Sequence, residues 1–509
     1  MLERKIEAFL RAWKGTPGHK PLILKGCRQC GKTFSVLKFA RENYASTVYV
    51  NFVENRNYAS AFSGKLDVDS IMLMLSALLP SPADFIPGRT IVVLDEIQEC
   101  PNARTALKFF YLDGRFDVIC TGSLLGVSGY RQQPASIPVG YETEKVMHPL
   151  DFEEFLWTQG IGRQHTELLA AALNSESPVP AALHARMREL LILYTVTGGM
   201  PEAVQCLVQT KNLSKVLQIQ RDIVSAYLDD MIKYADVHTK PLIRECFLSL
   251  PRQLSRENKK FQYTLVRKGA TAARFAGSLQ WLEDAGIVVR CHNLSLPELP
   301  LDGNSLPDKF KLYVHDTGLF ISMLEDGTQA DIMRGNLFGY KGAVFENLAA
   351  DILSKMDRRL YYFRKDSGLE IDFVLRYRGA CYLMEVKATT GDAKSVKTIL
   401  AHHEKYHVAG ALKFGDYNVG RRDKILTLPL YMMFLLNRSE SVPQLTLLYT
   451  PALMERPYSF QNFSYFSRSL ASMSASCFRI FFSRLRPMTL MVWFCCNNSR
   501  EIFRDRSGE

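Results

Sequence analysis

Short apolar runs alternate with amphipathic segments over the first 160 residues, which is the pattern of a parallel α/β sheet. Runs rich in aliphatic and β-branched side chains predict buried strands, and they lie at 22–24, 46–52, 90–94 and 116–120. Apolar side chains at helical spacing predict helices between these strands, over 2–14, 34–40 and 69–79. We therefore expect a parallel sheet with helices on both faces.

The pattern changes after this region. Residues 161–180 turn rich in alanine and then in serine and proline, which marks a boundary, and helical spacing returns between 181 and 234. Helical patterns over 242–254 and 270–283, followed by a strand and a second strand of a hairpin, predict a winged-helix arrangement. The expected domains are an ATPase domain at 1–160, a helical connector at 161–235, a winged-helix-like domain at 236–330, a small α/β domain at 331–436 and an atypical tail at 437–509.

The candidate chemistry begins where the first predicted strand ends, because residues 26–33 read GCRQCGKT. This is the phosphate-loop pattern, and it lies between a strand and a helix, as the motif requires. Backbone N–H groups of the loop bind phosphates, Lys32 reaches the outer phosphates, and the Thr33 hydroxyl can ligate Mg²⁺. The alternative is a glycine-rich turn that only joins strand to helix. The expected ATP-binding residues are Gly26, Cys27, Arg28, Gln29, Cys30, Gly31, Lys32 and Thr33.

Two acids end the third predicted strand, which reads TIVVLDE over 90–96. We expect Asp95 to hold Mg²⁺ together with Thr33, and Glu96 to orient or deprotonate the attacking water. Lys32 and Glu96 are therefore the candidate catalytic residues. The alternative is an acidic N-cap after a core strand. The fourth strand leads into Thr121-Gly122-Ser123, where a hydroxyl can sense the γ-phosphate or simply satisfy its own turn.

Composition limits the class of protein. The 509 residues are 47% hydrophobic and 23% charged, and no run approaches the ~18 apolar residues of a membrane span. The first residues are charged and carry no apolar signal core, so we expect a cytoplasmic protein that engages no membrane. The 11 cysteines are odd in number and scattered, which indicates reduced thiols. Cys27 and Cys30 lack a second pair, so we expect no metal or redox role for them.

The net charge of +11 permits a polyanionic partner. Part of that charge belongs to the tail, because without its 9 basic and 5 acidic residues the chain keeps 54 basic and 47 acidic residues, or +7. A basic cluster near the winged-helix pattern can contact phosphates, or it can be a solvated helix edge beside a protein-binding surface. Its members are Lys259, Lys260, Arg267, Lys268 and Arg274.

Several segments resemble a bacterial family of AAA-type ATP-binding proteins, in which an ATPase core precedes a region of unknown function. They are GCRQCGKT, VVLDEIQECP, CTGSLLGV, SIPVG, HPLDFEEFLW, GGMPEAV and YLDDMIKYAD. The resemblance implies the roles given above for the phosphate loop, Asp95 and Glu96, and a sensor role for Ser123 or Thr121. Related ATPases use an arginine finger, often from a neighbouring subunit, and the sequence does not choose among Arg104, Arg115 and Arg131.

A second group of charged residues lies between 340 and 436. Glu346 falls on a predicted helix, Asp372 on a strand, and Glu385 and Lys387 on the next strand, where they share one face. This spacing resembles the restriction-endonuclease-like core, in which two acids bind Mg²⁺ and the lysine positions the attacking hydroxide. The alternative is a pair of edge strands with a surface salt bridge. We interpret the nearby His402-His403-Glu404 as a solvated helix face.

The sequence thus predicts an AAA-type P-loop fold followed by a helical and winged-helix region and a restriction-endonuclease-like domain. The leading hypothesis is an ATP-binding, Mg²⁺-dependent ATPase that acts as a switch or motor and engages DNA or RNA through its C-terminal half. The alternative is a nucleotide-gated scaffold that binds proteins and carries an inactive nuclease-like domain. A homo-oligomer agrees with either hypothesis. A small-molecule kinase is disfavoured, because nothing marks an acceptor pocket.

Overall fold

The structure is a computed structural model, and it describes residues 2–80, 84–123, 140–234, 240–336, 340–388 and 390–440. The chain divides into two units, residues 1–441 and 442–509, and every described residue belongs to the first. The expected tail beyond Glu440 and the candidate finger Arg131 lie outside the described residues.

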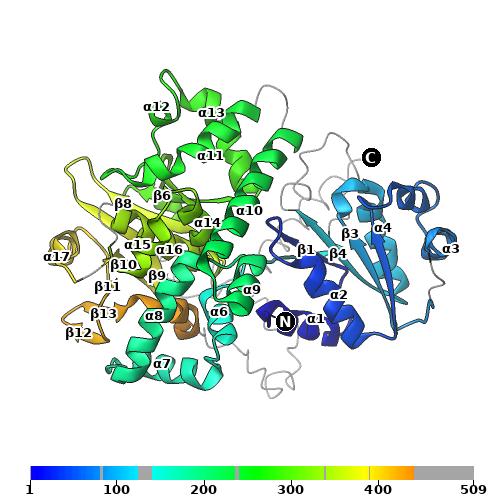
Figure 1. Cartoon of the computed structure of the whole chain (residues 1–509), viewed down its shortest axis with the longest axis horizontal. Helices are drawn as coiled ribbons and strands as arrows, with labels where there is room; N and C mark the ends of the chain where they lie inside the picture. Colours follow the sequence, from blue (N-terminus) through cyan, green and yellow to red (C-terminus); the bar gives the residue numbers. More distant parts are fainter. Residues whose placement is uncertain are drawn as a thin grey trace, which may run out of the picture. The chain divides into compact units, whose positions relative to one another are not determined.

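The N-terminal part contains a five-stranded sheet in the order β2-β3-β4-β1-β5, with all neighbours parallel. The strands are β1 (Leu22–Gly26), β2 (Ser46–Asn51), β3 (Thr90–Asp95), β4 (Asp117–Ser123) and β5 (Thr143–Val146). Its helices are α1 (Lys5–Gly15), α2 (Lys32–Asn43), α3 (Val68–Leu78) and α4 (Pro101–Asp113). The predicted parallel sheet with helices on both faces is therefore confirmed (Figure 1).

Strand β3 shows why this sheet needs helices on both sides. Its side chains alternate between two hydrophobic clusters: Val92 and Leu94 pack with α3 and α4, whereas Ile91 and Val93 pack with α1 and α2. All four side chains are fully buried. A continuous aliphatic run is the sequence signature of a strand covered on both faces, so here the local pattern specified the layering.

A helical region follows, from α6 to α13. It comprises α6 (Phe152–Thr158), α7 (Arg163–Ser175), α8 (Ala181–Thr197), α9 (Pro201–Thr210), α10 (Leu213–Tyr234), α11 (Lys240–Leu254), α12 (Tyr263–Val266) and α13 (Ala272–Asp284). The α8–α9 turn depends on Gly198, which has a φ of 69° and where a Cβ atom would lie 2.1 Å from Asp316 Oδ1. Among the described residues, no helix is long and apolar enough to cross a membrane.

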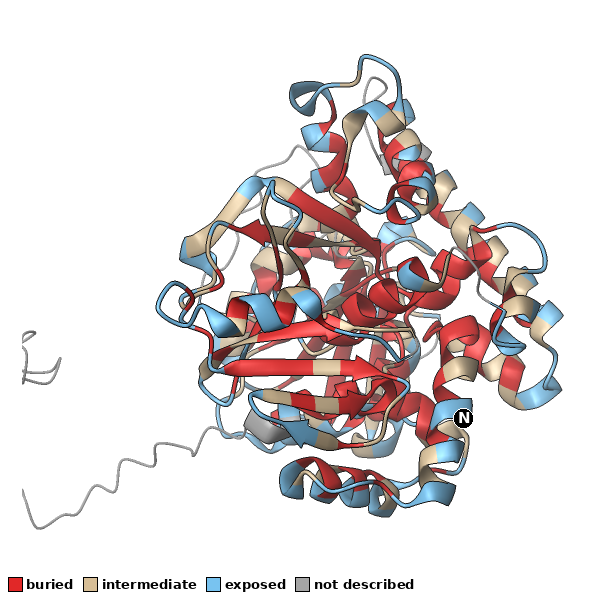
Figure 2. Ribbon diagram, turned by 90° about the vertical axis from the view of Figure 1, so that its left-hand side faces the viewer, coloured by how far each residue is buried: buried red, intermediate tan, exposed pale blue. Residues whose placement is uncertain are grey.

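The C-terminal part is built on an eight-stranded mixed sheet in the order β12-β13-β11-β10-β9-β8-β6-β7. Its strands are β6 (Val288–Leu294), β7 (Ser305–Val314), β8 (Leu360–Arg364), β9 (Glu370–Tyr377), β10 (Ala380–Val386), β11 (Gly410–Gly415), β12 (Gly420–Arg422) and β13 (Ile425–Pro429). Three helices also carry residues discussed below, α14 (Thr317–Ser322), α16 (Lys341–Ser354) and α17 (Lys394–Ala401). Most strand residues are buried, as Figure 2 shows.

The hairpin expected after the helices exists, but it is not separate from the strands that follow. β6 and β7 are antiparallel, and β6 also pairs in parallel with β8, with Cys291 opposite Leu360. The sheet therefore continues across the domain boundary expected at residue 330. Local periodicity does not encode this pairing, because the two strands are far apart in sequence and each looks complete by itself.

A buried ammonium group joins several of these parts. Lys355 on α16 lies with its Nζ 2.7 Å from Asp351 Oδ1 and 3.4 Å from Asp316 Oδ2. The same Nζ donates to the Leu150 carbonyl (3.2 Å) and to the Tyr194 hydroxyl (3.0 Å). The side chains of the lysine and both aspartates are almost wholly excluded from solvent. One cation thus connects the segment after β5, helix α8, the start of α14 and helix α16.

Replacing this cation is expected to destabilise the protein strongly. In Lys355→Met, two carboxylates stay buried without their cation, so we expect the free energy of unfolding to fall by about 3–5 kcal/mol. Urea denaturation followed by circular dichroism measures the change. Lys394→Met, which alters an exposed lysine on α17, is the control and should shift the free energy by less than about 0.5 kcal/mol. Equal curves for the two variants would contradict the structural role of Lys355.

Candidate functional site

The phosphate loop joins β1 to α2, as the sequence predicted. Gly26 ends β1 where the chain passes close to the segment after β5: a Cβ atom on it would lie 2.3 Å from the Met147 carbonyl oxygen. Only glycine fits there without moving the backbone. Helix α2 begins at Lys32, so its N-terminal N–H groups point into the loop, where they favour an anion.

Lys32 is buried and its ammonium group is held by the loop itself. Its Nζ donates to the carbonyls of Gly26 (3.1 Å) and Cys27 (2.8 Å). Phosphate oxygens are acceptors of the same kind, with more negative charge. The side chain is therefore in the loop from the start, and binding a phosphate needs only an exchange of acceptors.

Asp95 accepts hydrogen bonds from side chains of two neighbouring strands, β2 and β4, and from Thr33 after the loop. The Thr33 Oγ1 donates to both Asp95 carboxylate oxygens at 3.1 Å, and Tyr49 OH donates to Oδ2 at 2.8 Å. Thr121 Oγ1 also donates to Asp95, and Asn51 Nδ2 lies 3.3 Å from Oδ2. Thr33 and Asp95, the two residues predicted to share a magnesium ion, therefore lie in direct contact. Their oxygens are ligands of the type that Mg²⁺ takes.

Tyr49 and Asn51 are site residues that the sequence reasoning missed. Burial raises the pKa of Tyr49 well above its usual value, so its hydroxyl stays a donor to Asp95. Both side chains lie on the same face of β2, two residues apart, at the carboxyl end of the strand that pairs with β3. That alternation is visible in the sequence, but the order of the strands is not, and without it the pair cannot be assigned to Asp95.

Glu96 has an unusual backbone conformation. Its φ of 56° places it in the left-handed region, and its carboxylate accepts a hydrogen bond from Gln98 Nε2. A non-glycine residue there costs about 1–3 kcal/mol, and such strain is common at functional sites. The turn separates the side chain of Glu96 from the cluster around Asp95, so the two neighbouring acids have different partners. That Glu96 orients or deprotonates the attacking water stays a prediction.

The two described candidates for the arginine finger are engaged within their own domain. Arg104 pairs with Glu142 and with Glu144 Oε1 (3.1 Å). Arg115 pairs at 2.7 Å with both Asp69 and Asp113. An arginine that serves a neighbouring subunit would have to leave such pairs.

Helix α10 contacts the phosphate loop directly. Arg28 Nε lies 2.6 Å from Asp230 Oδ2, and Tyr227 OH donates to the Arg28 carbonyl at 3.2 Å. Both partners lie in the last two turns of α10. Arg28, Ser123, Tyr227 and Asp230 also line one small cavity. The predicted sensor residue Ser123 therefore lies at the contact between the loop and this helix.

The second predicted group of residues is brought together by α16, β9 and β10. Lys387 Nζ lies 2.5 Å from Glu385 Oε1, and Asp372 Oδ2 accepts a hydrogen bond from the Val386 N–H at 2.8 Å. Burial, with the nearby charges of Glu385 and Glu346, raises the pKa of Asp372 to about 8. Glu346 and Glu385 are buried and Asp372 is half-buried, and the three acids lie close enough to affect one another's charge.

Two further lysines, which the sequence reasoning did not assign to this group, bind its acid on α16. Lys311 Nζ, fully buried on β7, lies 2.8 Å from Glu346 Oε1 and 2.9 Å from Glu370 Oε1, and Lys259 pairs with the other oxygen of Glu346. Burial alone would raise the pKa of Glu346, but these two ammonium groups lower it to about 2. Within the described ranges, no group of three His, Cys, Asp or Glu residues is arranged to hold a metal ion.

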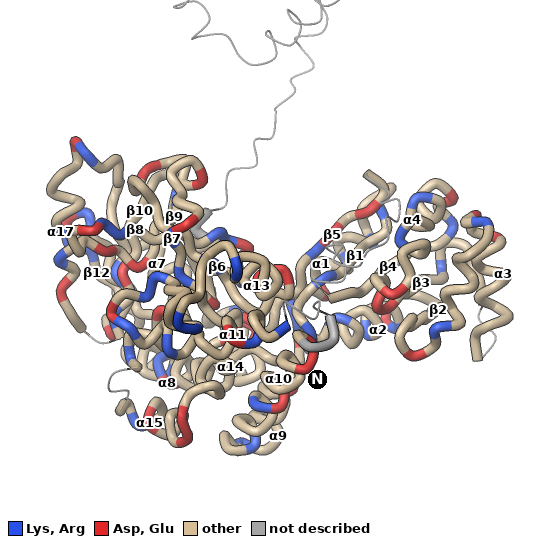
Figure 3. The backbone as a smooth tube through the Cα atoms, turned by 90° about the horizontal axis from the view of Figure 1, so that it is seen from above, with Lys and Arg blue, Asp and Glu red and all other residues tan. Residues whose placement is uncertain are grey.

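Two members of the basic cluster are engaged in ion pairs with acids of the same chain. Lys259 is bound to Glu346, and Arg267 Nε lies 3.0 Å from Glu245 Oε2. Along the rest of the backbone, positions of lysine and arginine alternate with positions of aspartate and glutamate, as Figure 3 shows. His402, His403 and Glu404 are exposed, but they follow α17, which ends at Ala401, and lie in a turn, so they do not form the helix face that was expected; His402 Nδ1 contacts the Thr398 carbonyl.

The raised pKa of Asp372 predicts a pH dependence of stability. A carboxyl whose pKa is higher in the folded state favours folding below its unfolded value, near 4, and loses that contribution as the pH rises through about 8. Asp372→Asn, which cannot ionise, should therefore gain stability relative to the wild type between pH 5 and pH 8. Urea denaturation in EDTA at several pH values measures this difference. Asp423→Asn, at an exposed position, should follow the wild type.

Three family models match the chain. They are an AAA domain over residues 18–156, a domain of unknown function (DUF8612) over residues 188–330, and another (DUF4143) over residues 341–432. No curated protein matches the sequence. The matches follow the order that the resemblance implied, with the ATPase core first and the regions of unknown function after it.

Several solved structures are distantly similar. The Walker-type ATPase PABY2304 of Pyrococcus abyssi is 14% identical, with 64% of this chain and 96% of that chain covered and a TM-score of 0.37. The ORC2 protein of Aeropyrum pernix is 14% identical (65% and 92% covered, TM-score 0.30), and DnaA from Aquifex aeolicus is 10% identical (56% and 90%, TM-score 0.27). The chain is an AAA-domain protein, in which that domain is followed by two domains of unknown function.

Proposed function

We propose that this chain is a Mg²⁺-dependent ATPase that acts as a switch and controls how its C-terminal half engages nucleic acid. The observation that carries the proposal is the contact of Thr33 with both carboxylate oxygens of Asp95 at 3.1 Å, beside a phosphate loop that already contains the Lys32 ammonium group. A hydroxyl and a carboxylate in this position are the two protein ligands that a P-loop ATPase offers to magnesium.

The residues of the loop divide the chemistry among them. The N–H groups at the start of α2 and the Lys32 ammonium bind the phosphate oxygens, and Thr33 and Asp95 would hold Mg²⁺, which supplies positive charge at the transferred phosphate. Tyr49 and Thr121 donate to Asp95 and so orient its carboxylate. Glu96 accepts a proton from the attacking water or orients it. Because this chemistry is mostly positioning and charge, small shifts of the loop change its rate.

The contact between the loop and α10 is the route by which the state of the nucleotide reaches the rest of the chain. Arg28 lies within the phosphate-binding segment and pairs with Asp230 on α10. In its N-terminal half, α10 binds the C-terminal end of α8, where Gln220 Nε2 donates to the Val196 and Thr197 carbonyls at 2.9 and 2.8 Å. A rigid helix anchored at both places transmits a displacement of the loop to the C-terminal half.

The C-terminal half supports nucleic-acid engagement through its charges. The exposed members of the basic cluster, Lys268 and Arg274, are available for phosphate contacts. Asp372, Glu385 and Lys387 lie together, and Glu385 Oε2 is buried with no hydrogen-bond partner among the described residues. A buried carboxylate oxygen without a partner is costly, and a cation delivered with a phosphodiester would satisfy it.

One observation favours the second candidate, a nucleotide-gated scaffold without nuclease activity. Lys311 and Lys259 already neutralise Glu346, so ammonium groups take the place that a metal ion has in a nuclease. In that case the acids and lysines stabilise the fold, and the C-terminal half binds a partner without cutting it. The two candidates agree on the ATPase and differ in its output.

The ATPase is tested with variants of the loop and of Glu96. Lys32→Ala is expected to lower ATP turnover by about 10²–10³-fold, since it removes charge from the transition state. Glu96→Gln should lower turnover by about 10²–10⁴-fold and leave ATP bound. Phosphate release and isothermal titration calorimetry measure turnover and binding. Lys65→Ala, at an exposed position of the same domain, is the matched control. Undiminished turnover in both site variants would refute the assignment.

The proposed engagement of nucleic acid is tested by adding DNA or RNA to the purified full chain. Under the leading proposal, nucleic acid binds and raises ATP turnover, and gel shifts with and without ATP show different affinities. Any Mg²⁺- or Mn²⁺-dependent cleavage should disappear in the Asp372→Ala/Glu385→Ala double variant. Cleavage that persists in that variant would exclude the second site as its source. If no nucleic acid binds the chain or raises its ATP turnover, the result would establish the scaffold candidate instead.

A further inference from the structure

Two cysteines contact each other inside the phosphate loop. The side chains of Cys27 and Cys30 are hydrogen-bonded, and both are buried, with 3% and 0% of their surface exposed. The Cys30 Sγ lies 3.4 Å from the Met147 carbonyl oxygen and 4.0 Å from the Lys32 Nζ. Two hydrogen-bonded thiols only three positions apart in the chain are candidates for a disulfide, which requires the sulfurs to come within about 2.05 Å of each other.

The surroundings shift the pKa values of the two cysteines in opposite directions, so that one is a thiolate and the other a thiol. The hydrogen bond from Cys27, together with the positive charges of Lys32 and Arg4, lowers the pKa of Cys30 to about 6 against the opposing effect of burial. The same hydrogen bond and burial raise the pKa of Cys27. At neutral pH one sulfur is therefore nucleophilic and the other carries the proton, which is the state in which a dithiol reacts.

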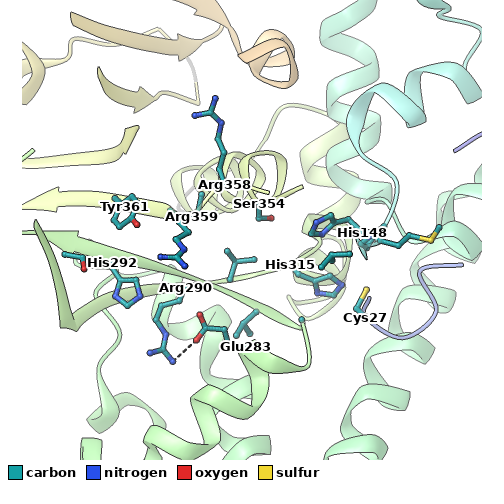
Figure 4. Close-up of a pocket in the computed structure, with 18 of the residues that line it drawn as sticks. Cys27, His148, Glu283, Arg290, His292, His315, Ser354, Arg358, Arg359 and Tyr361 are labelled. Atoms are coloured by element: carbon teal, nitrogen blue, oxygen red, sulfur yellow. Dashed lines mark ion pairs between the residues drawn. The ribbon is translucent and has the colours of Figure 1, made fainter. Parts of the chain in front are cut away.

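The pair can be reached through a cavity. Cys27 forms part of the lining of a cavity of 530 Å³, together with Met147, His148 and His315. Figure 4 shows the Cys27 sulfur at one end of this space, near the His148 and His315 rings. Cys27 is the member of the pair that lines this cavity, so a small oxidant can reach the Cys27 sulfur, and burial does not exclude chemistry there.

We propose that Cys27 and Cys30 are a modification site at which a hydroperoxide forms a disulfide, and that this disulfide weakens the binding of ATP to the loop. The inference rests on the proposed function for its effect on ATP, but not for the modification itself. Cys27, which lines the cavity, passes its proton to the Cys30 thiolate and attacks the peroxide: the O–O bond breaks, an S–O bond forms and an alcohol, or water in the case of hydrogen peroxide, leaves. The second sulfur then displaces the new hydroxyl group as water, and the S–S bond replaces the S–O bond.

The disulfide acts on the residues that bind phosphate. An S–S bond of about 2.05 Å is much shorter than a hydrogen-bonded contact between sulfurs, so the loop must contract across Arg28 and Gln29. Gln29 already has a φ of 62°, and Arg28 is tied to Asp230 on α10. Oxidation also removes the negative charge beside the Lys32 ammonium. The loop then loses its freedom to wrap around a phosphate.

The modification is detected with trypsin, because Arg28 lies between the two cysteines. Cleavage after Arg28 separates Cys27 from Cys30 in the reduced protein, whereas a disulfide keeps the two peptides joined until dithiothreitol is added. The full chain is treated with hydrogen peroxide, and ATP binding with Mg²⁺ is measured by calorimetry before treatment, after treatment and after reduction. We expect joined peptides and a Kd for ATP that rises by about tenfold or more and returns on reduction.

Three variants control the experiment, each compared with its own reduced form. Cys27→Ser and Cys30→Ser should yield no joined peptides and lose the change in Kd that treatment causes. Cys206→Ser, which alters a half-buried thiol on α9, should keep both effects. The inference is overturned if no joined peptides form, or if the joined form binds ATP as the reduced form does. Absence of ATP binding in the reduced protein would instead refute the proposed function, while the joined peptides would still decide whether the pair is a modification site.

Discussion

The buried Lys355 ammonium group and the two aspartates beside it constrain the arrangement of all the parts that follow the AAA domain. Asp316 accepts hydrogen bonds from the Gly199 N–H (2.6 Å) and the Leu319 N–H (3.1 Å), and Lys355 donates to the Leu150 carbonyl. Unpaired charges in such a position would be strongly destabilising. These groups can be buried only when α8, α14, α16 and the segment after β5 meet at one place, and that meeting directs α10 toward the phosphate loop.

A second buried lysine affects the interpretation of the C-terminal half. Lys311 satisfies Glu346 and Glu370 from β7, on a strand outside the segment that carries the predicted nuclease-like residues. The same acids therefore admit two roles, as ligands in a catalytic site or as partners in a structural ion pair. A buried ion pair specifies which strands meet as well as contributing charge. The placement of β7 in the shared sheet makes this an experimental question about Asp372 and Glu385.

At the nucleotide end, the carboxylate of Asp95 and the side chain of Arg28 have complementary roles. Asp95 accepts hydrogen bonds from β2, β4 and Thr33, so its carboxylate oxygens are held in place by the sheet. Arg28 instead faces outward, to Asp230 on α10. The loop is thus rigid on the side of the chemistry and linked to a helix on the other side. The Cys27–Cys30 pair lies between the two, where a change in covalent structure affects both.

The sequence by itself determined the features that are local. The aliphatic run of β3 specified a strand covered on both faces, and GCRQCGKT between a strand and a helix specified the loop, because periodicity and motif spacing act over a few residues. Only the tertiary structure decided that Tyr49 reaches Asp95, that Lys311 binds Glu346, that β6 pairs with β8, and that the thiols of the loop are close to a cation and a cavity. These contacts join residues distant in sequence, and burial and charge act through space, so no local pattern contains them.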